Sequence, residues 1–324
     1  MTKDCKRIIS ILGHDIPLGA SKEINFNIAK LHTSTAIEVP VIIERSKKPG
    51  PTILFTAGIH GDEINGVDIV RQLIATKINK PKRGTIICMP ILNVFGFLNS
   101  SRNFPDGRDL NRVFPGSASG SLASRVAHRL IHEIIPEVDL IIDFHTGGAS
   151  RFNAAQIRII KEDQKLEDLA TVFGAPFTLY SNNLAKSFRN ACHQIGKPIL
   201  LFEGGKSSFV DDTISKIGIE GAKRILNHYE MLNVKKKSSP PKEPTKFVDD
   251  SKWLRARRSG MFKAKIDMYT KVNIDDVLGQ ITDPYGKLHH TVKSTIDGYI
   301  ININEASLVY QGDALFHITT KLKN

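Results

Sequence analysis

Through the first two thirds of the chain, short runs of apolar residues alternate with longer amphipathic stretches. The short runs are bounded by glycine, proline or polar residues, as buried strands are, whereas the longer stretches place apolar residues at helical spacing. The predicted strands are TILFTAG (52–58), TIICMPI (85–91), LIIDFHT (140–146) and PILLFEG (198–204). The predicted helices cover 64–78, 121–136, 164–174 and a segment near 212–232. This alternation predicts an α/β domain in which helices flank a sheet that contains parallel strands.

The last quarter of the chain has a different pattern, in which short alternating runs are separated by glycine. The runs are SGMFKAKI, KVNIDDVLGQI, GKLHHTVKS, DGYIININ and YQGDALFHI, and they predict a small all-β domain. Two units, VNIDDVLGQI and LVYQGDALFHI, resemble the halves of a lipoyl- or biotinyl-carrier barrel-sandwich. Such carriers display a modifiable lysine at a hairpin tip, where this chain has DPYGK. We therefore expect a structural domain in which Lys287 is not modified.

A polar, proline-rich segment, KKKSSPPKEPTK (235–246), separates the two patterns. Segments of this composition form extended connectors between domains. The length of 324 residues also exceeds the roughly 250–300 residues beyond which single cores tend to split into domains. We expect an α/β catalytic domain over 1–232, a linker over 233–250 and the all-β domain over 251–324.

The chain is basic, with a formal net charge of +12, but much of this charge is local. Residues 235–265 carry eleven Lys and Arg against three Asp and Glu, a net of +8. A solvated linker explains this better than nucleic-acid binding, because Trp253 stands alone and aromatic residues are not interleaved. No secretory leader or membrane-spanning run is recognisable, so we expect a soluble, cytoplasmic protein with no nucleic-acid or membrane partner. Cys5, Cys88 and Cys192 are scattered, which favours buried free thiols.

Three of the predicted strands end in ionisable residues that are followed closely by glycine, in FTAGIHGDE, DFHTGG and LFEGG. In an open parallel sheet, ligands bind beyond the carboxyl ends of the strands. We therefore expect His60, Glu63, His145 and Glu203 to be neighbours. His60 and Glu63 lie three residues apart where a helix begins, which places both side chains on the same side.

Two imidazoles and one carboxylate form a ligand set of catalytic zinc, with the fourth tetrahedral position left for water. We expect His60, Glu63 and His145 to hold one Zn²⁺ per chain, and Glu203 to act as the general base and acid. A lone HxxE is more typical of a surface pair on a helix. The combination with His145 and Glu203, each at a strand end before glycine, is what favours a metal site.

The segment SSRNFPDGRDLNRVFPG (100–116) is long for a loop without regular structure, and loops of this length are usually functional. Arginine binds carboxylates through two parallel hydrogen bonds, so Arg102, Arg108 and Arg112 beside Asn111 favour recognition of an anionic substrate. A solvated basic loop is the alternative interpretation.

These motifs together resemble the succinylglutamate desuccinylase/aspartoacylase family, whose members are relatives of zinc carboxypeptidases. The motifs occur in the order GIHGDE, RNFPDGRDLNRVFPG, DFHTG and FEGG, and a C-terminal β-domain also fits the layout of the family. The resemblance implies a mixed sheet like that of zinc carboxypeptidases, zinc held by His60, Glu63 and His145, and Glu203 as the catalytic carboxylate.

The resemblance also implies roles within the arginine-rich loop. Arg102 would steady the oxyanion, and Asn111 with Arg112 would hold the α-carboxylate of the substrate. Asp109 would orient the first zinc-binding histidine, and Tyr310 resembles a tyrosine that contacts substrate in aspartoacylases. Pro105-Asp106-Gly107 lengthens the loop relative to aspartoacylases, which is more similar to bacterial deacylases of N-acetylated amino acids such as N-acetyl-diaminobutyrate. Arg108 has no role in the family pattern.

We therefore expect a zinc-dependent amide hydrolase that deacylates a small anionic N-acyl amino acid. A metallocarboxypeptidase is the second hypothesis, since the same chemistry cleaves C-terminal peptide bonds when the cleft is open. A non-catalytic binding protein built on the β-domain is the third. The sequence leaves open which acyl group and amino acid are used, and whether the chain forms a homo-oligomer.

Overall fold

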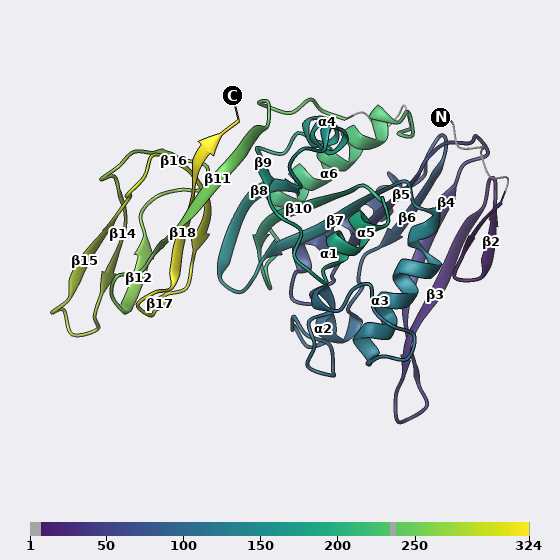
Figure 1. The fold of residues 1–324 in the computed structure, drawn as a ribbon, viewed down its shortest axis with the longest axis horizontal. Coiled ribbons are helices and arrows are strands. Elements are labelled where there is room, and N and C mark those ends of the chain that lie inside the picture. Colours follow the sequence, from purple (N-terminus) through teal and green to yellow (C-terminus); the bar gives the residue numbers. More distant parts are fainter. Residues whose placement is uncertain (1–7, 234–237, 324) are drawn as a thin grey trace.

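The computed structural model describes residues 8–233 and 238–323. Cys5 and residues 234–237 of the expected linker lie outside this range. The structure is built around a twelve-stranded mixed sheet, whose order is β13-β16-β18-β11-β9-β8-β10-β7-β5-β6-β4-β3. Figure 1 shows this sheet running through the molecule, with helices packed against its central part and only strands towards the C-terminal end.

The four predicted strands form the centre of the sheet and are confirmed. They are β5 (Thr52–Ala57), β6 (Thr85–Met89), β7 (Leu140–Gly147) and β10 (Ile199–Lys206). These strands are parallel in the order β10-β7-β5-β6. Nearly all their side chains are buried, because helices cover both faces of this part of the sheet.

The predicted helices are also confirmed, and they fall on two sides of the sheet. α1 (Ile64–Ala75), α4 (Gln164–Phe173) and α6 (Asp212–His228) pack on one face in a core with Phe144 and Phe202. α3 (Leu122–Glu133) and α5 (Phe188–Gln194) pack on the other face, where the side chains of Leu54 and Ile141 point. Short elements complete the loops, namely α2 (Val94–Leu98), η1 (Leu110–Arg112) and η2 (Ile135–Glu137).

Residues 8–45 form four strands that were not predicted from the sequence. They are β1 (Ile8–Ile11), β2 (His14–Pro17), β3 (Ser21–Lys30) and β4 (Ala36–Arg45). β3 and β4 pair antiparallel, and β4 adds to the sheet beside β6. Their buried residues alternate with exposed ones and extend the core under α3.

The C-terminal region consists of strands, as predicted; four of its strands continue the twelve-stranded sheet, and the other four form a separate sheet. Its strands are β11 (Lys246–Arg255), β12 (Gly260–Ala264), β13 (Lys271–Val272), β14 (Val277–Thr282), β15 (His289–Lys293), β16 (Gly298–Asn304), β17 (Leu308–Val309) and β18 (Ala314–Leu322). The expected domain boundaries and the barrel-sandwich arrangement stay predictions. β11 begins inside the range expected as linker.

Five strands from both regions close into a ring that joins the two parts of the molecule. Two of them, β8 (Arg151–Ile159) and β9 (Phe177–Tyr180), precede the linker. β8 pairs with β9, β9 with β11, β11 with β18, β18 with β16, and β16 again with β8. A small apolar cluster fills the ring and includes Ala154, Phe177 and Ile301. The C-terminal strands are therefore hydrogen-bonded to the central sheet on both sides of the ring.

Candidate metal centre

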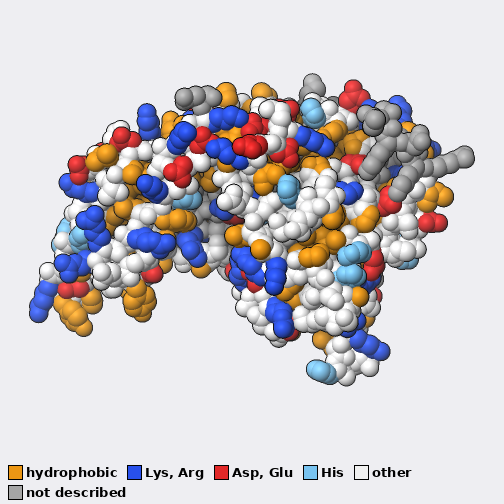
Figure 2. Space-filling model, in the orientation of Figure 1, with side chains coloured by type: hydrophobic (Ala, Val, Ile, Leu, Met, Phe, Trp, Pro, Cys, Tyr) orange, Lys and Arg blue, Asp and Glu red, His pale blue; other side chains and the backbone are white. Residues whose placement is uncertain are grey.

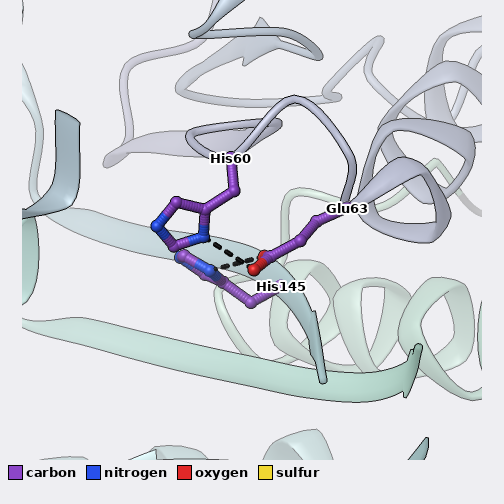
Figure 3. Close-up of side chains that lie close together, drawn as sticks. All are labelled: His60, Glu63 and His145. Carbon is purple, nitrogen blue, oxygen red and sulfur yellow. Dashed lines mark hydrogen bonds and ion pairs between the residues drawn. The ribbon is translucent and has the colours of Figure 1, made fainter. Parts of the chain in front are cut away.

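The side chains of His60, Glu63 and His145 converge at the carboxyl ends of β5 and β7, as predicted (Figure 3). His60 lies in the loop that follows β5, and Glu63 directly precedes the first residue of α1. His145 lies near the end of β7, next to β5 in the sheet. All three are at least 96% buried, and their ligand atoms lie within 4.8 Å of one another.

A close backbone contact fixes the loop that carries His60. A Cβ atom on Gly61 would lie only 1.8 Å from the carbonyl carbon of Gly96 in α2, so only glycine fits. The Gly61 amide donates a hydrogen bond to the carbonyl of Ser101 at 3.1 Å. This bond ties the loop carrying His60 to the loop carrying Arg102.

The carboxylate of Glu63 faces both imidazoles. Its Oε1 lies 2.6 Å from His60 Nδ1, and its Oε2 lies 2.8 Å from His145 Nδ1. Oε2 also accepts a hydrogen bond from the amide of Thr146 at 3.2 Å. Two Nδ1 atoms and one carboxylate thus lie together, a set of donor atoms that could hold a metal ion and that also occurs in catalytic zinc sites.

The second nitrogen of each imidazole contacts a further carboxylate. His60 Nε2 lies 3.2 Å from Asp109, and His145 Nε2 lies 2.8 Å from Asp143. Metal-binding histidines commonly donate their other N–H to a carboxylate, which fixes the tautomer and directs the free nitrogen at the metal. The contact of Asp109 agrees with the role expected for it. Asp143 was not predicted, although it lies two residues before His145 and strand alternation places both side chains on one face.

Electrostatics in this cluster favour a bound cation. Burial opposes charge on His145, yet the carboxylates of Asp143 and Glu63 raise the pKa of its imidazole well above the usual range. Burial likewise opposes charge on His60, and Glu63 and Asp109 raise its pKa. Burial disfavours the Glu63 carboxylate, but both imidazoles outweigh it and hold its pKa far below the usual range. The site is therefore built to keep positive charge, as protons or as a metal ion, beside a permanent carboxylate.

These pKa directions predict that metal affinity rises with pH. Below the raised pKa values of His60 and His145 the imidazoles hold protons that a metal must displace, whereas above them the nitrogens are free. Calorimetric titration of Zn²⁺ in buffers of different ionisation enthalpy should show proton release at about neutral pH. Affinity that did not change between about pH 6 and pH 8 would contradict this assignment.

Arg102 lies beside the cluster, and the oxyanion role expected for it stays a prediction. Its guanidinium contacts Asp109 at 2.9 Å and lies 3.3 Å from Nδ1 of His60. Asn111 lies in the short helix η1, where its Oδ1 accepts a hydrogen bond from the amide of Phe188 at 2.8 Å. This contact leaves the Asn111 NH₂ group as the polar end available to a ligand.

Glu203 is brought to the same face of the sheet. Its Cα pairs with that of His145 across β10 and β7, and paired residues on neighbouring strands point to the same side. The Glu203 carboxylate accepts a hydrogen bond from Asn153 Nδ2 at 2.5 Å and lies 3.6 Å from the guanidinium of Arg158.

A cavity of about 400 Å³ joins these groups, which is within the usual range for small-ligand sites. The three cluster residues line it together with Glu203 and Asn111. Five arginines also line it, namely Arg102, Arg112, Arg151, Arg158 and Arg189. The C-terminal strands contribute two more residues, Trp253 and Asn302. Figure 2 shows Lys and Arg side chains bordering the hollow between the C-terminal strands and the α/β part on the face it displays.

Two residues expected near the substrate lie elsewhere. Tyr310 is 77% exposed, and Arg108 forms an ion pair with Asp106 at 3.4 Å. Neither belongs to the described residues that line the cavity. Several lining residues were not anticipated as site residues, among them Asn153, Arg158, Arg189 and Trp253. These four lie in β8, α5 and β11, and no local sequence pattern indicates that these segments pack beside the cluster.

The fold and the cluster define a mixed α/β protein with a buried His-Glu-His site of the kind that holds one metal ion. The model of the succinylglutamate desuccinylase/aspartoacylase catalytic domain matches residues 49–229. Because this match covers more than half of the chain, the chain belongs to that family, and the family identifies it as a hydrolase of the deacylase type. Residues 8–233 and 238–323 contain no helix long and apolar enough to cross a membrane.

Individual relatives agree with this family. The chain is 28% identical over 263 residues to the N-α-acetyl-L-2,4-diaminobutyric acid deacetylase of Halomonas elongata, a match that covers 76% of this chain and 75% of the relative. The fold of this chain is similar to that of a succinylglutamate desuccinylase/aspartoacylase from Rhodobacter sphaeroides. The TM-score is 0.79 at 23% sequence identity, and the match covers 98% of this chain and 100% of that one. The product-bound ectoine utilization protein EutE of Ruegeria pomeroyi gives a TM-score of 0.81 at 22% identity, with coverage of 98% and 100%.

Proposed function

We propose that the protein is a zinc-dependent deacylase of small N-acyl amino acids, and that it releases an acyl carboxylate and a free amine. The observation that supports this most strongly is the arrangement of the cluster: Glu63 bridges His60 and His145, and each imidazole is held from behind by a carboxylate. A bound Zn²⁺ would polarise the acyl carbonyl and lower the pKa of a coordinated water towards about 7.

The residues around the cluster supply the other parts of an amide hydrolysis. Glu203 takes a proton from the attacking water and passes it to the leaving amine nitrogen as the C–N bond breaks. Arg102, beside His60, donates hydrogen bonds to the oxygen that becomes negative when water adds to the carbonyl. Asn111 and Arg112 would hold the α-carboxylate of the substrate through the amide NH₂ and the guanidinium.

The C-terminal region favours a small substrate over a peptide. Trp253 and Asn302 form part of the cavity wall, and β16 is hydrogen-bonded to β8 beside the site. Opening the cleft to a peptide would require breaking this strand pairing. The metallocarboxypeptidase hypothesis therefore has less support than the deacylase.

The cavity also favours an anionic substrate. Its acidic residues are all engaged, since Glu63 and Asp143 serve the cluster and Glu203 contacts Asn153. Arg189 is 91% buried, and within the described residues its guanidinium contacts oxygens of Ser181 and Asn182 but no carboxylate. Burial and the neighbouring Arg158 lower the pKa of Arg189 to about 10. A substrate carboxylate would relieve this repulsion between cations.

Replacing Arg112 with alanine should raise KM about tenfold or more with a smaller change in kcat, because a carboxylate contact made before and during the reaction is lost. Binding can be followed through the fluorescence of Trp253, the single tryptophan of the chain, which lines the same cavity. Arg125→Ala, which removes an exposed arginine from α3, is the matched control. An unchanged KM for Arg112→Ala would remove Arg112 from the binding site.

The proposed function is tested by metal analysis of the purified protein combined with a panel of N-acetyl, N-succinyl and dipeptide substrates. We expect one zinc per chain and hydrolysis of N-acyl amino acids but not of dipeptides. Release of C-terminal residues from peptides would favour the carboxypeptidase instead. A protein that binds no metal and hydrolyses nothing in the panel would favour a binding protein built on the β-domain. The cytoplasmic location and a homo-oligomeric state stay predictions.

A further inference from the structure

A chain of two buried amides connects the C-terminal region to the catalytic carboxylate. Asn302 in β16 donates from Nδ2 to Oδ1 of Asn153 in β8 at 2.6 Å. Asn153 in turn donates from its own Nδ2 to Oε2 of Glu203 at 2.5 Å. Asn153 and Asn302 are 96% and 98% buried, and their Cα atoms are direct partners in the antiparallel pairing of β8 and β16.

The hydrogen bond from Asn302 determines which end of the Asn153 amide faces Glu203. An asparagine side chain has a donor NH₂ end and an acceptor oxygen end, and a half-turn about its last bond exchanges them. Because Asn302 donates to the oxygen, Asn153 must present its NH₂ group to the carboxylate. If the amide turned around, its oxygen would face a negatively charged oxygen and the contact would become repulsive. Asn302 therefore fixes the one orientation in which Asn153 can hold Glu203.

We propose that Asn153 and Asn302 are positioning residues for Glu203, so that the C-terminal region completes the active site instead of only covering it. The inference rests on the proposed function of Glu203 as the proton carrier. In this arrangement Asn153 binds one carboxylate oxygen, and the other oxygen would take the proton of the attacking water. Asn302 acts only through Asn153.

Further contacts agree with a positioning role. Within the described residues, the Oδ1 atom of Asn302 is buried and has no hydrogen-bond partner, so this side chain is a costly choice for stability alone. The pairing of β10 with both neighbours is irregular directly after Glu203, which leaves room for Asn153 to reach the carboxylate. The guanidinium of Arg158 also approaches the same oxygen, but at 3.6 Å its contact is longer than that of Asn153.

The test compares Asn302→Leu, which removes the donor at similar volume, with Asn304→Ala as a matched control. Asn304 lies in the same strand and bonds to the carbonyl of Ala314 instead of to Asn153. We expect kcat for Asn302→Leu to fall on the order of 10- to 100-fold with little change in KM, the size of effect that misplacement of a catalytic group produces. Asn304→Ala should retain the wild-type kcat.

A second arm separates positioning from general destabilisation. In a Glu203→Gln background the group that Asn302 acts upon is already lost, so Asn302→Leu should cause no further loss of kcat. If kcat of the double variant fell by the product of the two losses seen in the single variants, the proposal would be overturned. Asn302→Ser, whose hydroxyl keeps a donor, is the conservative variant, and partial recovery of kcat relative to Asn302→Leu is expected.

Crystal structures of the wild type and of the Asn302 variants test the same claim without measuring activity. We expect the Glu203 carboxylate to be ordered against Asn153 in the wild type, and displaced or in several conformers in Asn302→Leu and, less so, in Asn302→Ser. A carboxylate that keeps its position in both variants would overturn the proposal even if the rates changed. If the wild type hydrolyses no N-acyl amino acid, the proposed function fails, while this structural arm still decides whether Asn302 positions Glu203.

Discussion

Replacing His145 with alanine should eliminate metal binding and, with it, hydrolysis. His145 is buried, supplies Nδ1 to the cluster at 2.8 Å from Glu63, and is held by Asp143 on its other side. Without it, only one imidazole and one carboxylate remain to bind the ion, and Asp143 loses its partner. Loss of a catalytic metal removes several kcal/mol of transition-state stabilisation, so the rate should fall by on the order of 10³-fold or more. Metal content by mass spectrometry and kcat/KM on the same preparation are the measurements.

His132→Ala is the control for this prediction. His132 is exposed on α3 and is not part of the three-residue cluster, and its Nδ1 contacts the carbonyl of His128. It should leave both the zinc content and the rate unchanged. Full zinc content in His145→Ala would show that the metal is bound elsewhere.

Replacing Glu203 with glutamine should lower kcat by roughly 10²- to 10⁴-fold while zinc content stays at the wild-type level. Glutamine keeps the size of the side chain and one acceptor oxygen, but it does not accept the proton of the attacking water or return it to the amine. Glu203 is not one of the three residues of the metal cluster, so binding of the ion should persist. Rates are measured on preparations with matched zinc content.

Glu230→Gln is the matched substitution at an exposed position, where the carboxylate contacts only Arg83 at 2.9 Å in the described structure. It should behave as the wild type. If Glu203→Gln and Glu230→Gln both kept the kcat of the wild type, another group would have to carry the proton. The proposed mechanism would then be wrong.

Much of the site follows from local sequence signals combined with one rule of sheet architecture. His60, Glu63, His145 and Glu203 each follow or end a short apolar run, and parallel strands bring their carboxyl ends to one edge. The register supports this reasoning, because the Cα of Glu203 pairs with that of His145. Asp143 could have been found in the same way, from its spacing of two residues before His145 in a strand.

The remaining parts of the site depend on contacts between distant segments, for which no local pattern exists. Asn153, Asn302 and Trp253 reach the cavity because β8, β16 and β11 belong to one closed ring of strands. Of these three, only β16 falls in a run that the sequence pattern predicted to be a strand, and that pattern does not indicate which strands it pairs with. The hairpin of β3 and β4 was not predicted either, although its buried residues alternate with exposed ones along both strands.

The roles of the residues in the arginine-rich loop are the part of the site that residue type predicts least well. Arg102 contacts the cluster directly through Asp109 and His60, whereas Arg108 pairs with Asp106 at the surface. The two arginines differ only in where the loop places them. Their residue type and charge are the same, so composition cannot distinguish a group that touches the substrate from one that stabilises the loop.

The proposed function depends on one metal ion held by His60, Glu63 and His145. The most direct measurement is an anomalous difference map from crystals of the purified protein, recorded at the zinc absorption edge. We predict one peak per chain, with the Nδ1 atoms of both histidines and a Glu63 oxygen at about 2.0–2.2 Å from it. A map with no peak among these three side chains, or with its zinc bound at another site, would contradict the account.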